Sequence, residues 1–80
     1  MTDQQMRNKM RKFFLKMLKT NKRVFVISGY IKVFGNVQSV KPDSVIIRTE
    51  TGKIKFIFDQ IEITGEPNVY YHSGVKFKVC

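Results

Sequence analysis

The hydrophobic residues of this chain follow one period in the first 20 residues and a different one after residue 23. Near the N-terminus they recur every three or four positions, at Met6, Met10, Phe13, Phe14, Met17 and Leu18. This spacing aligns them along one side of an α-helix. Thr2 and Gln5 match a capping box, and Asn21 suits a helix end. The sequence therefore predicts a helix over residues 3–20.

From Val24 onward, apolar and polar residues alternate in short stretches that are bounded by turn-forming residues. We expect strands over residues 24–27, 30–40, 45–49, 53–59 and 61–63. Turns are expected at residues 28–29, 41–44 and 51–52. One face of the second strand carries Tyr30, Lys32 and Phe34. Gly35 lies in the middle of this strand, which indicates a bend or a β-bulge there.

A helix followed by short, bent strands at this spacing is typical of a small barrel. We predict a mainly β fold with an N-terminal α-helix and a strongly bent, five-stranded antiparallel barrel, Sm-like or SH3-like. The domain is expected to span residues 1–66, with the helix at about 3–20 and the strands within about 23–64. Residues 67–80 form a C-terminal extension. Its alternation of Val75, Phe77 and Val79 with Lys76 and Lys78 predicts an added strand or hairpin.

Composition excludes several classes of function. The chain of 80 residues has one cysteine and one histidine, so we expect no disulfide, no metal site and no cofactor. It shows no nucleophile–base pair and no phosphate-binding loop, so we expect no catalytic residue and no small-molecule substrate. Without a membrane span or a secretory signal, a cytoplasmic location is the expectation. Self-association would add buried surface to so short a chain.

The positive charge is concentrated at the N-terminus. The net charge is +9, and the first 23 residues hold eight of the fifteen basic residues against a single acid, Asp3. Such a concentration is typical of a surface that binds nucleic acid phosphates or anionic lipid headgroups. A solvated face that only keeps the protein soluble is the alternative. The candidate phosphate contacts in this region are Arg7, Arg11, Lys12, Lys22 and Arg23.

Tyr30, Lys32 and Phe34 place two aromatic rings on either side of a cation. Single-stranded nucleic acid is bound by such groups, through stacking of bases on the rings and attraction of phosphates to the cation. The alternative is that Phe34 packs under the helix or at a subunit boundary.

The order of these elements resembles the Sm/Hfq-like family of RNA-binding proteins over roughly residues 10–64. The resemblance is carried by Phe14-Leu15 and Leu18, by the glycine-bracketed segment Gly29 to Val37, by Val45-Ile46-Ile47 and by Ile61-Glu62-Ile63. It implies a homo-oligomeric ring, usually a hexamer in the bacterial branch, in which the fourth strand of one subunit pairs with the fifth strand of the next. It also implies binding of single-stranded RNA by an RNA chaperone or post-transcriptional regulator.

Two segments depart from the family pattern. Bacterial members carry a Tyr-Lys-His-Ala-like segment whose Lys and His help hold uridine, and here the sequence reads Ile57-Phe58-Asp59-Gln60. The loop over residues 40–44 has no aromatic residue to stack on a base. The polar groups left at the pocket positions are Lys41, Asp43, Ser44, Asp59 and Gln60. They either read a uracil edge by hydrogen bonding or serve as plain turn residues.

Three functions follow from these patterns. The one we expect is single-stranded RNA binding by a homo-oligomeric ring, with RNA and further copies of the chain as partners. The second is an SH3-like or OB-like barrel that acts as a DNA-binding or protein-interaction module. The third is a membrane-surface protein that docks its basic amphipathic helix on anionic lipid.

Overall fold

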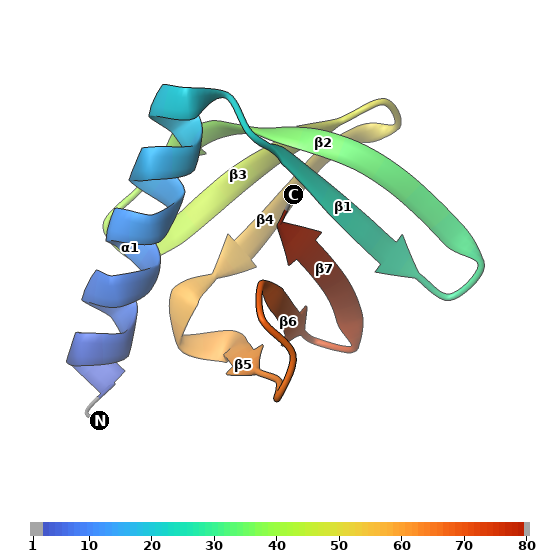
Figure 1. Ribbon diagram of the computed structural model, residues 1–80. Helices are drawn as coiled ribbons and strands as arrows, with labels where there is room; N and C mark the ends of the chain where they lie inside the picture. The colour runs from blue at the N-terminus through green and yellow to red at the C-terminus, as the bar shows by residue number, and fades with distance from the viewer. Residues whose placement is uncertain (1–2, 80) are drawn as a thin grey trace.

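The computed structural model describes residues 3–79, which form one helix packed against a curled antiparallel sheet (Figure 1). Helix α1 covers Asp3–Thr20. The strands are β1 (Arg23–Ser28), β2 (Ile31–Val40), β3 (Ser44–Thr49), β4 (Gly52–Ile57), β5 (Ile61–Ile63), β6 (Val69–His72) and β7 (Val75–Val79). A short 3-10 helix, η1 (Phe58–Gln60), joins β4 to β5.

The predicted mainly β fold with one N-terminal helix is confirmed, but the sheet has seven strands rather than five. The strands lie in the order β4-β3-β2-β1-β7-β6-β5, and the sheet curls into a half-barrel. The two additional strands come from the C-terminal segment, where β6 and β7 form a hairpin. Strand β7 pairs with β1, and β6 pairs with β5. This hairpin therefore lies inside the sheet, and the sheet ends at β4 and β5.

Helix α1 ends where the sequence indicates. Asn21 adopts a left-handed conformation with φ of 53°, and the Lys22 N–H donates to the Met17 carbonyl over 3.2 Å. This is the closing hydrogen bond of a Schellman-type helix end. The predicted cap residue Thr2 lies outside the described residues. The helix buries Met10, Phe14 and Met17 against the inner face of the sheet, as an amphipathic helix is expected to do.

Aromatic side chains fill the interior of the half-barrel. Phe56 of β4 and Phe77 of β7 stack with their ring centroids 4.6 Å apart. These strands are not neighbours in the sheet, so their contact crosses the hollow of the curl. Phe14 of the helix lies 5.9 Å from Phe58 and 6.2 Å from Phe77. The helix and the two ends of the sheet therefore share one aromatic core.

The first hairpin turns one residue later than the sequence predicts. Ser28 pairs with Ile31, so the two-residue turn is Gly29-Tyr30 rather than Ser28-Gly29. Gly29 adopts a positive φ of 59°, which a hairpin of this length requires and which glycine adopts without strain. Tyr30 therefore lies in the turn, fully exposed, and is not part of the strand.

Gly35 does not form the predicted bulge. It pairs in regular register with Val24 and Thr49, and the register shift falls between Val37 and Ser39. A Cβ atom at Gly35 would lie 2.7 Å from the Arg48 carbonyl oxygen. The glycine is thus required by the close approach of β3 to β2.

We predict that Gly35→Ala lowers the free energy of unfolding by roughly 1–3 kcal/mol, because an added methyl group in a closely packed site forces the backbone apart. Urea denaturation followed by circular dichroism measures this change. Gly65→Ala is the matched control, since a Cβ there meets nothing within 4 Å. Equal effects of the two substitutions would contradict this account of Gly35.

His72 links the two ends of the curled sheet. It is buried, its Nε2 atom accepts a hydrogen bond from the Ile57 N–H over 2.9 Å, and its ring lies edge-on to Phe56. Burial lowers the pKa of His72 below its usual value, because a charged imidazolium loses hydration there. Protonation would also replace the acceptor of the Ile57 N–H with a second donor.

We therefore predict that the protein loses stability in mild acid. The unfolded state has the higher His72 pKa, near 6.5, and binds the proton more readily than the folded state. The contribution of neutral His72 to the free energy of unfolding is thus complete above that pH, and it is lost as the pH falls toward the lower pKa of the folded state. Urea denaturation at pH 7.5 and 5.5 measures the loss. His72 is the only histidine. An equal loss of stability between these two pH values in His72→Gln would therefore contradict the assignment of the loss to His72.

Candidate nucleic-acid interface

Every basic residue of the strands lies on the outer face of the sheet, opposite to the helix. The strand register aligns Lys53, Arg48, Asn36 and Arg23 across four neighbouring strands. The same register aligns Lys32 with Ile27 and Lys76, and Phe25 with Lys78. The outer-face cations are Arg23, Lys32, Arg48, Lys53, Lys55, Lys76 and Lys78. Glu62 of β5 is the acid that shares this face within the strands, since it aligns with Tyr71 and Lys76.

Three aromatic rings lie on this face, Phe25, Phe34 and Tyr71, and the first two form a pair. Phe25 of β1 and Phe34 of β2 are register partners, and their ring centroids are 4.7 Å apart. Phe34 is 45% exposed, although an apolar ring of this size is ordinarily buried. The Arg23 guanidinium lies 5.8 Å from the centre of the Phe34 ring, within the range of a cation–π contact. An exposed ring of this kind is available for stacking.

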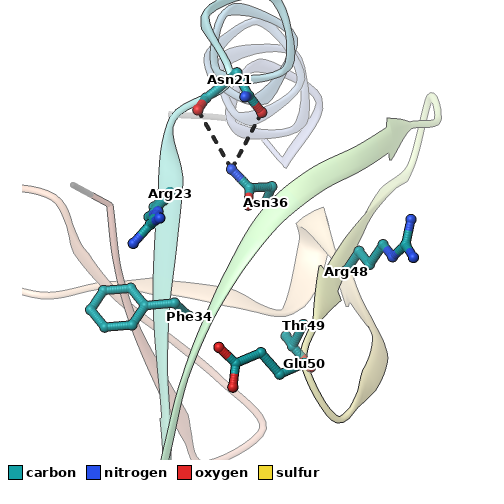
Figure 2. A pocket seen from close by; sticks show the side chains of 7 residues that line it. All are labelled: Asn21, Arg23, Phe34, Asn36, Arg48, Thr49 and Glu50. Carbon is teal, nitrogen blue, oxygen red and sulfur yellow. Dashed lines mark hydrogen bonds between the residues drawn. The ribbon is translucent and has the colours of Figure 1, made fainter.

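An open hollow adjoins Phe34, beside the connection between α1 and β1 (Figure 2). Its volume is about 610 Å³. The Asn36 amide nitrogen donates to the Asn21 carbonyl and Oδ1 atoms over 3.5 and 3.3 Å, which holds its side chain against the end of the helix. The hollow is completed by Arg23, Arg48, Thr49 and Glu50. Its lining therefore combines one aromatic ring with several polar and charged groups.

The charged groups around this hollow point in different directions. Figure 2 shows the Glu50 side chain directed toward β2, the strand that carries Phe34, whereas the Arg48 guanidinium points away from β2. Within residues 3–79 the structure gives Glu50 neither a hydrogen bond nor an ion pair. Its carboxylate is thus an available acceptor in a strongly cationic environment.

The helix carries a second basic surface, on the side of the molecule that faces away from the sheet. Arg11 and Lys12 are exposed there, and Lys22 is exposed just after the helix. These predicted phosphate contacts are free to meet a polyanion. They lie on the opposite side of the molecule from Phe34, since the apolar face of α1 packs on the inner face of the sheet.

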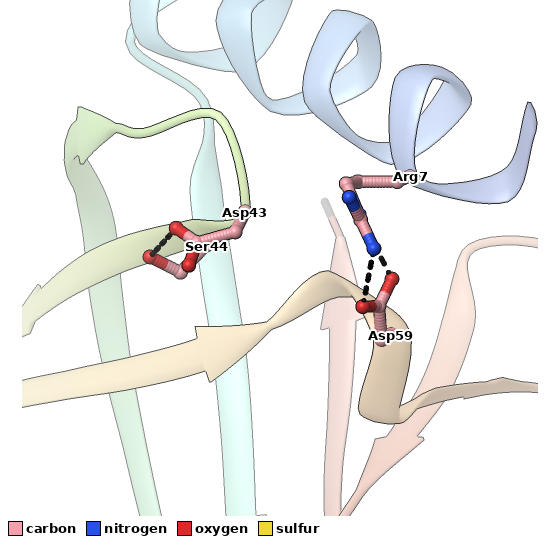
Figure 3. Close-up of polar contacts among 4 residues, drawn as sticks. All are labelled: Arg7, Asp43, Ser44 and Asp59. Atoms are coloured by element: carbon pink, nitrogen blue, oxygen red, sulfur yellow. Dashed lines mark hydrogen bonds and ion pairs between the residues drawn. The ribbon is translucent and has the colours of Figure 1, made fainter. Parts of the chain in front are cut away.

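Arg7 differs from the other helix cations because it pairs with an acid (Figure 3). Its Nε and Nη2 atoms donate to the two carboxylate oxygens of Asp59 over 3.0 and 2.7 Å. Hydrogen bonding to Arg7 lowers the pKa of Asp59, and the charge of the guanidinium acts in the same direction. This two-point contact fastens the first turns of α1 to η1 and occupies Arg7.

The predicted uridine-pocket residues have structural contacts of their own. Ser44 is fully buried, and its hydroxyl donates to Asp43 over 3.2 Å (Figure 3). The Lys41 N–H donates to the Ser44 carbonyl over 2.8 Å and closes the loop between β2 and β3. Gln60 is exposed and accepts a hydrogen bond from Ser73 over 3.5 Å. Ser44 in particular presents no hydroxyl to a ligand.

Sequence reasoning identified Lys32, Phe34 and Arg23 but missed their neighbours Phe25, Lys76 and Lys78. The alternation of lysine with apolar residues in β4 and β7 was a usable signal, because it predicts a strand with one charged face. Which strands those faces adjoin could not be inferred, since β1 and β7 are more than 40 residues apart in the chain.

Among the described residues, no helix is both long and apolar enough to cross a bilayer. That part of the chain also holds no group of three or more histidine, cysteine, aspartate or glutamate residues that could bind a metal ion. No family model matches the sequence, and searches of curated proteins and of solved structures find no significant similarity.

Proposed function

We propose that this protein binds single-stranded nucleic acid, with RNA as the expected ligand, on the outer face of its sheet. The observation that carries the proposal is the contact of the exposed Phe34 with the half-buried Phe25, surrounded by strand cations. Stacking on such a ring contributes about 1–3 kcal/mol per base, whichever base is bound. Lys32, Lys78 and Arg23 surround the pair and supply the phosphate contacts.

A single strand fits this surface better than a duplex. In a duplex the base faces are already stacked on one another, so Phe34 has no face to contact. A single strand can splay its bases onto the rings while its backbone follows the cations. The preference for RNA over DNA rests on the resemblance to the Sm/Hfq-like family alone. It does not rest on a contact to a 2′-hydroxyl group. The proposed role, an RNA chaperone or post-transcriptional regulator, rests on the same resemblance.

The helix cations have a different part in this proposal. Arg11, Lys12 and Lys22 lie on the helix side of the molecule, away from the exposed Phe34 ring. In this proposal they attract phosphates without holding bases. Tyr30 is a further exposed ring near the site, in the turn that joins β1 to β2. It is placed to stack on a base that continues past Lys32.

The family resemblance also leads us to propose a homo-oligomeric ring. In such a ring the fourth strand of one subunit pairs with the fifth strand of the next. Within the described residues, β4 and β5 are the two outermost strands of the sheet. Their unpaired backbone groups support the proposal, because open sheet edges favour pairing with another chain.

The stacking role predicts that Phe34→Leu weakens binding of a fluorescein-labelled uridine octamer by roughly tenfold, since leucine keeps the apolar volume but offers no ring face. Fluorescence anisotropy measures the affinity at several salt concentrations. The salt dependence should stay unchanged, because no cation is removed. A variant that binds as tightly as the original protein would contradict the stacking role.

The phosphate contacts predict a different signature for Lys32→Gln/Lys78→Gln. Removing two contacts should lower the slope of log affinity against log salt by roughly 1.4, since each contact to a single strand contributes about 0.7. The matched control is Lys9→Gln/Lys19→Gln, which removes the same charge from the helix. An equal loss of slope in both variants would show that charge alone drives binding. Stronger binding to duplex than to single strands would contradict the proposed ligand.

The ring proposal predicts a mass near that of a hexamer in light scattering at micromolar protein. Phe34→Leu should leave this mass unchanged, because Phe34 lies away from both sheet edges. A monomer would contradict the ring. Binding of nucleic acid on the outer face would then be tested by the anisotropy measurements alone.

A further inference from the structure

We infer that the hollow beside Phe34 is a base-selective subsite that prefers guanine. This inference rests on the proposed function and gives the same surface a sequence preference. The subsite consists of the Phe34 ring, the Glu50 carboxylate, the Asn36 side chain and the Arg23 guanidinium. The Phe34 ring stacks on the face of a base, Glu50 and Asn36 form hydrogen bonds with the edge of that base, and Arg23 neutralises the adjoining phosphate.

The position of Glu50 carries the argument. Its side chain points toward β2, the strand that carries Phe34 (Figure 2), and it lines the same hollow as Phe34. Within residues 3–79 the Glu50 side chain has neither a hydrogen bond nor an ion pair. An acid on a surface that attracts phosphates weakens that attraction unless it makes a contact of its own. A hydrogen bond from a bound base would satisfy this carboxylate and offset the repulsion.

Asn36 also offers an acceptor. Its amide nitrogen is directed at the carbonyl oxygens of Asn21 and Lys22, over 3.5 and 3.4 Å, and at Asn21 Oδ1 over 3.3 Å. The Asn36 Oδ1 atom, on the other branch of the amide, has no hydrogen bond within the described residues. The edge-reading groups of the hollow are thus acceptors, and they require a base that donates.

Guanine is the base that meets this requirement. Its N1–H and N2–H groups are adjacent donors on one edge, and their spacing matches the two oxygens of a carboxylate. Adenine and cytosine each place one amino donor beside a ring nitrogen that accepts, which would repel the second oxygen. Uracil has one N–H between two carbonyl groups. A carboxylate beside a stacking ring therefore selects guanine over the other three bases.

The test compares four uridine-rich RNA octamers that differ at one central position, which holds G, A, C or U. A single guanine avoids four-stranded structures. By fluorescence anisotropy, the protein should bind the guanine octamer roughly tenfold more tightly than the others, as expected for a two-point contact to a base. Glu50→Gln should remove this preference, because the glutamine amide donates where the guanine N1–H also donates. It should leave binding of the all-uridine octamer equal or slightly stronger.

Glu66→Gln is the matched control, since it removes an equal charge from the exposed loop between β5 and β6. It should keep the guanine preference. Equal affinity of the original protein for all four octamers, or a preference that survives in Glu50→Gln, would overturn the subsite. If the four octamers bind equally but Phe34→Leu still weakens them, the proposed function stands and the subsite fails. If none of them binds, both fail.

Discussion

The contact between Phe56 and Phe77 across the interior of the curl is the interaction on which the rest of this structure depends. The two rings come from strands that are not neighbours in the sheet, and they stack with centroids 4.6 Å apart. The hydrogen bond from the Ile57 N–H to His72 closes the same gap. Because these contacts hold the sheet in a half-barrel, its inner face can be filled by Met10, Phe14 and Met17 of one helix.

The curl also determines where the charge goes. Side chains alternate along each strand, so a sheet with a largely apolar inner face sends its lysines and arginines to the outer face. That face gains the exposed ring of Phe34 near Lys32, with Phe25 between Phe34 and Lys78, while the helix keeps its own cations on the opposite side. One physical requirement, burial of the aromatic core, thus produces both the fold and the candidate interface.

The elements themselves were largely predictable. The helix over Asp3–Thr20 and the short strand Ile61–Ile63 match their predicted ranges, because their hydrophobic periods are clear. The turn at Gly29-Tyr30 was predicted one residue early, since either neighbour of Gly29 suits a two-residue turn and only the pairing of Ser28 with Ile31 decides between them. The bulge predicted at Gly35 was wrong, because a bulge and a close approach of strands leave the same trace in a sequence.

The sequence by itself determined the helix, the strand faces and the total charge, since these depend on residues that are near one another in the chain. It placed Lys32 and Phe34 on the same face of their strand for the same reason. Only the tertiary structure decided that β7 lies against β1, that Lys78 therefore adjoins Phe25, and that Glu50 lines the same hollow as Phe34. Those juxtapositions join distant segments through the packing of a shared core, and no local pattern encodes them.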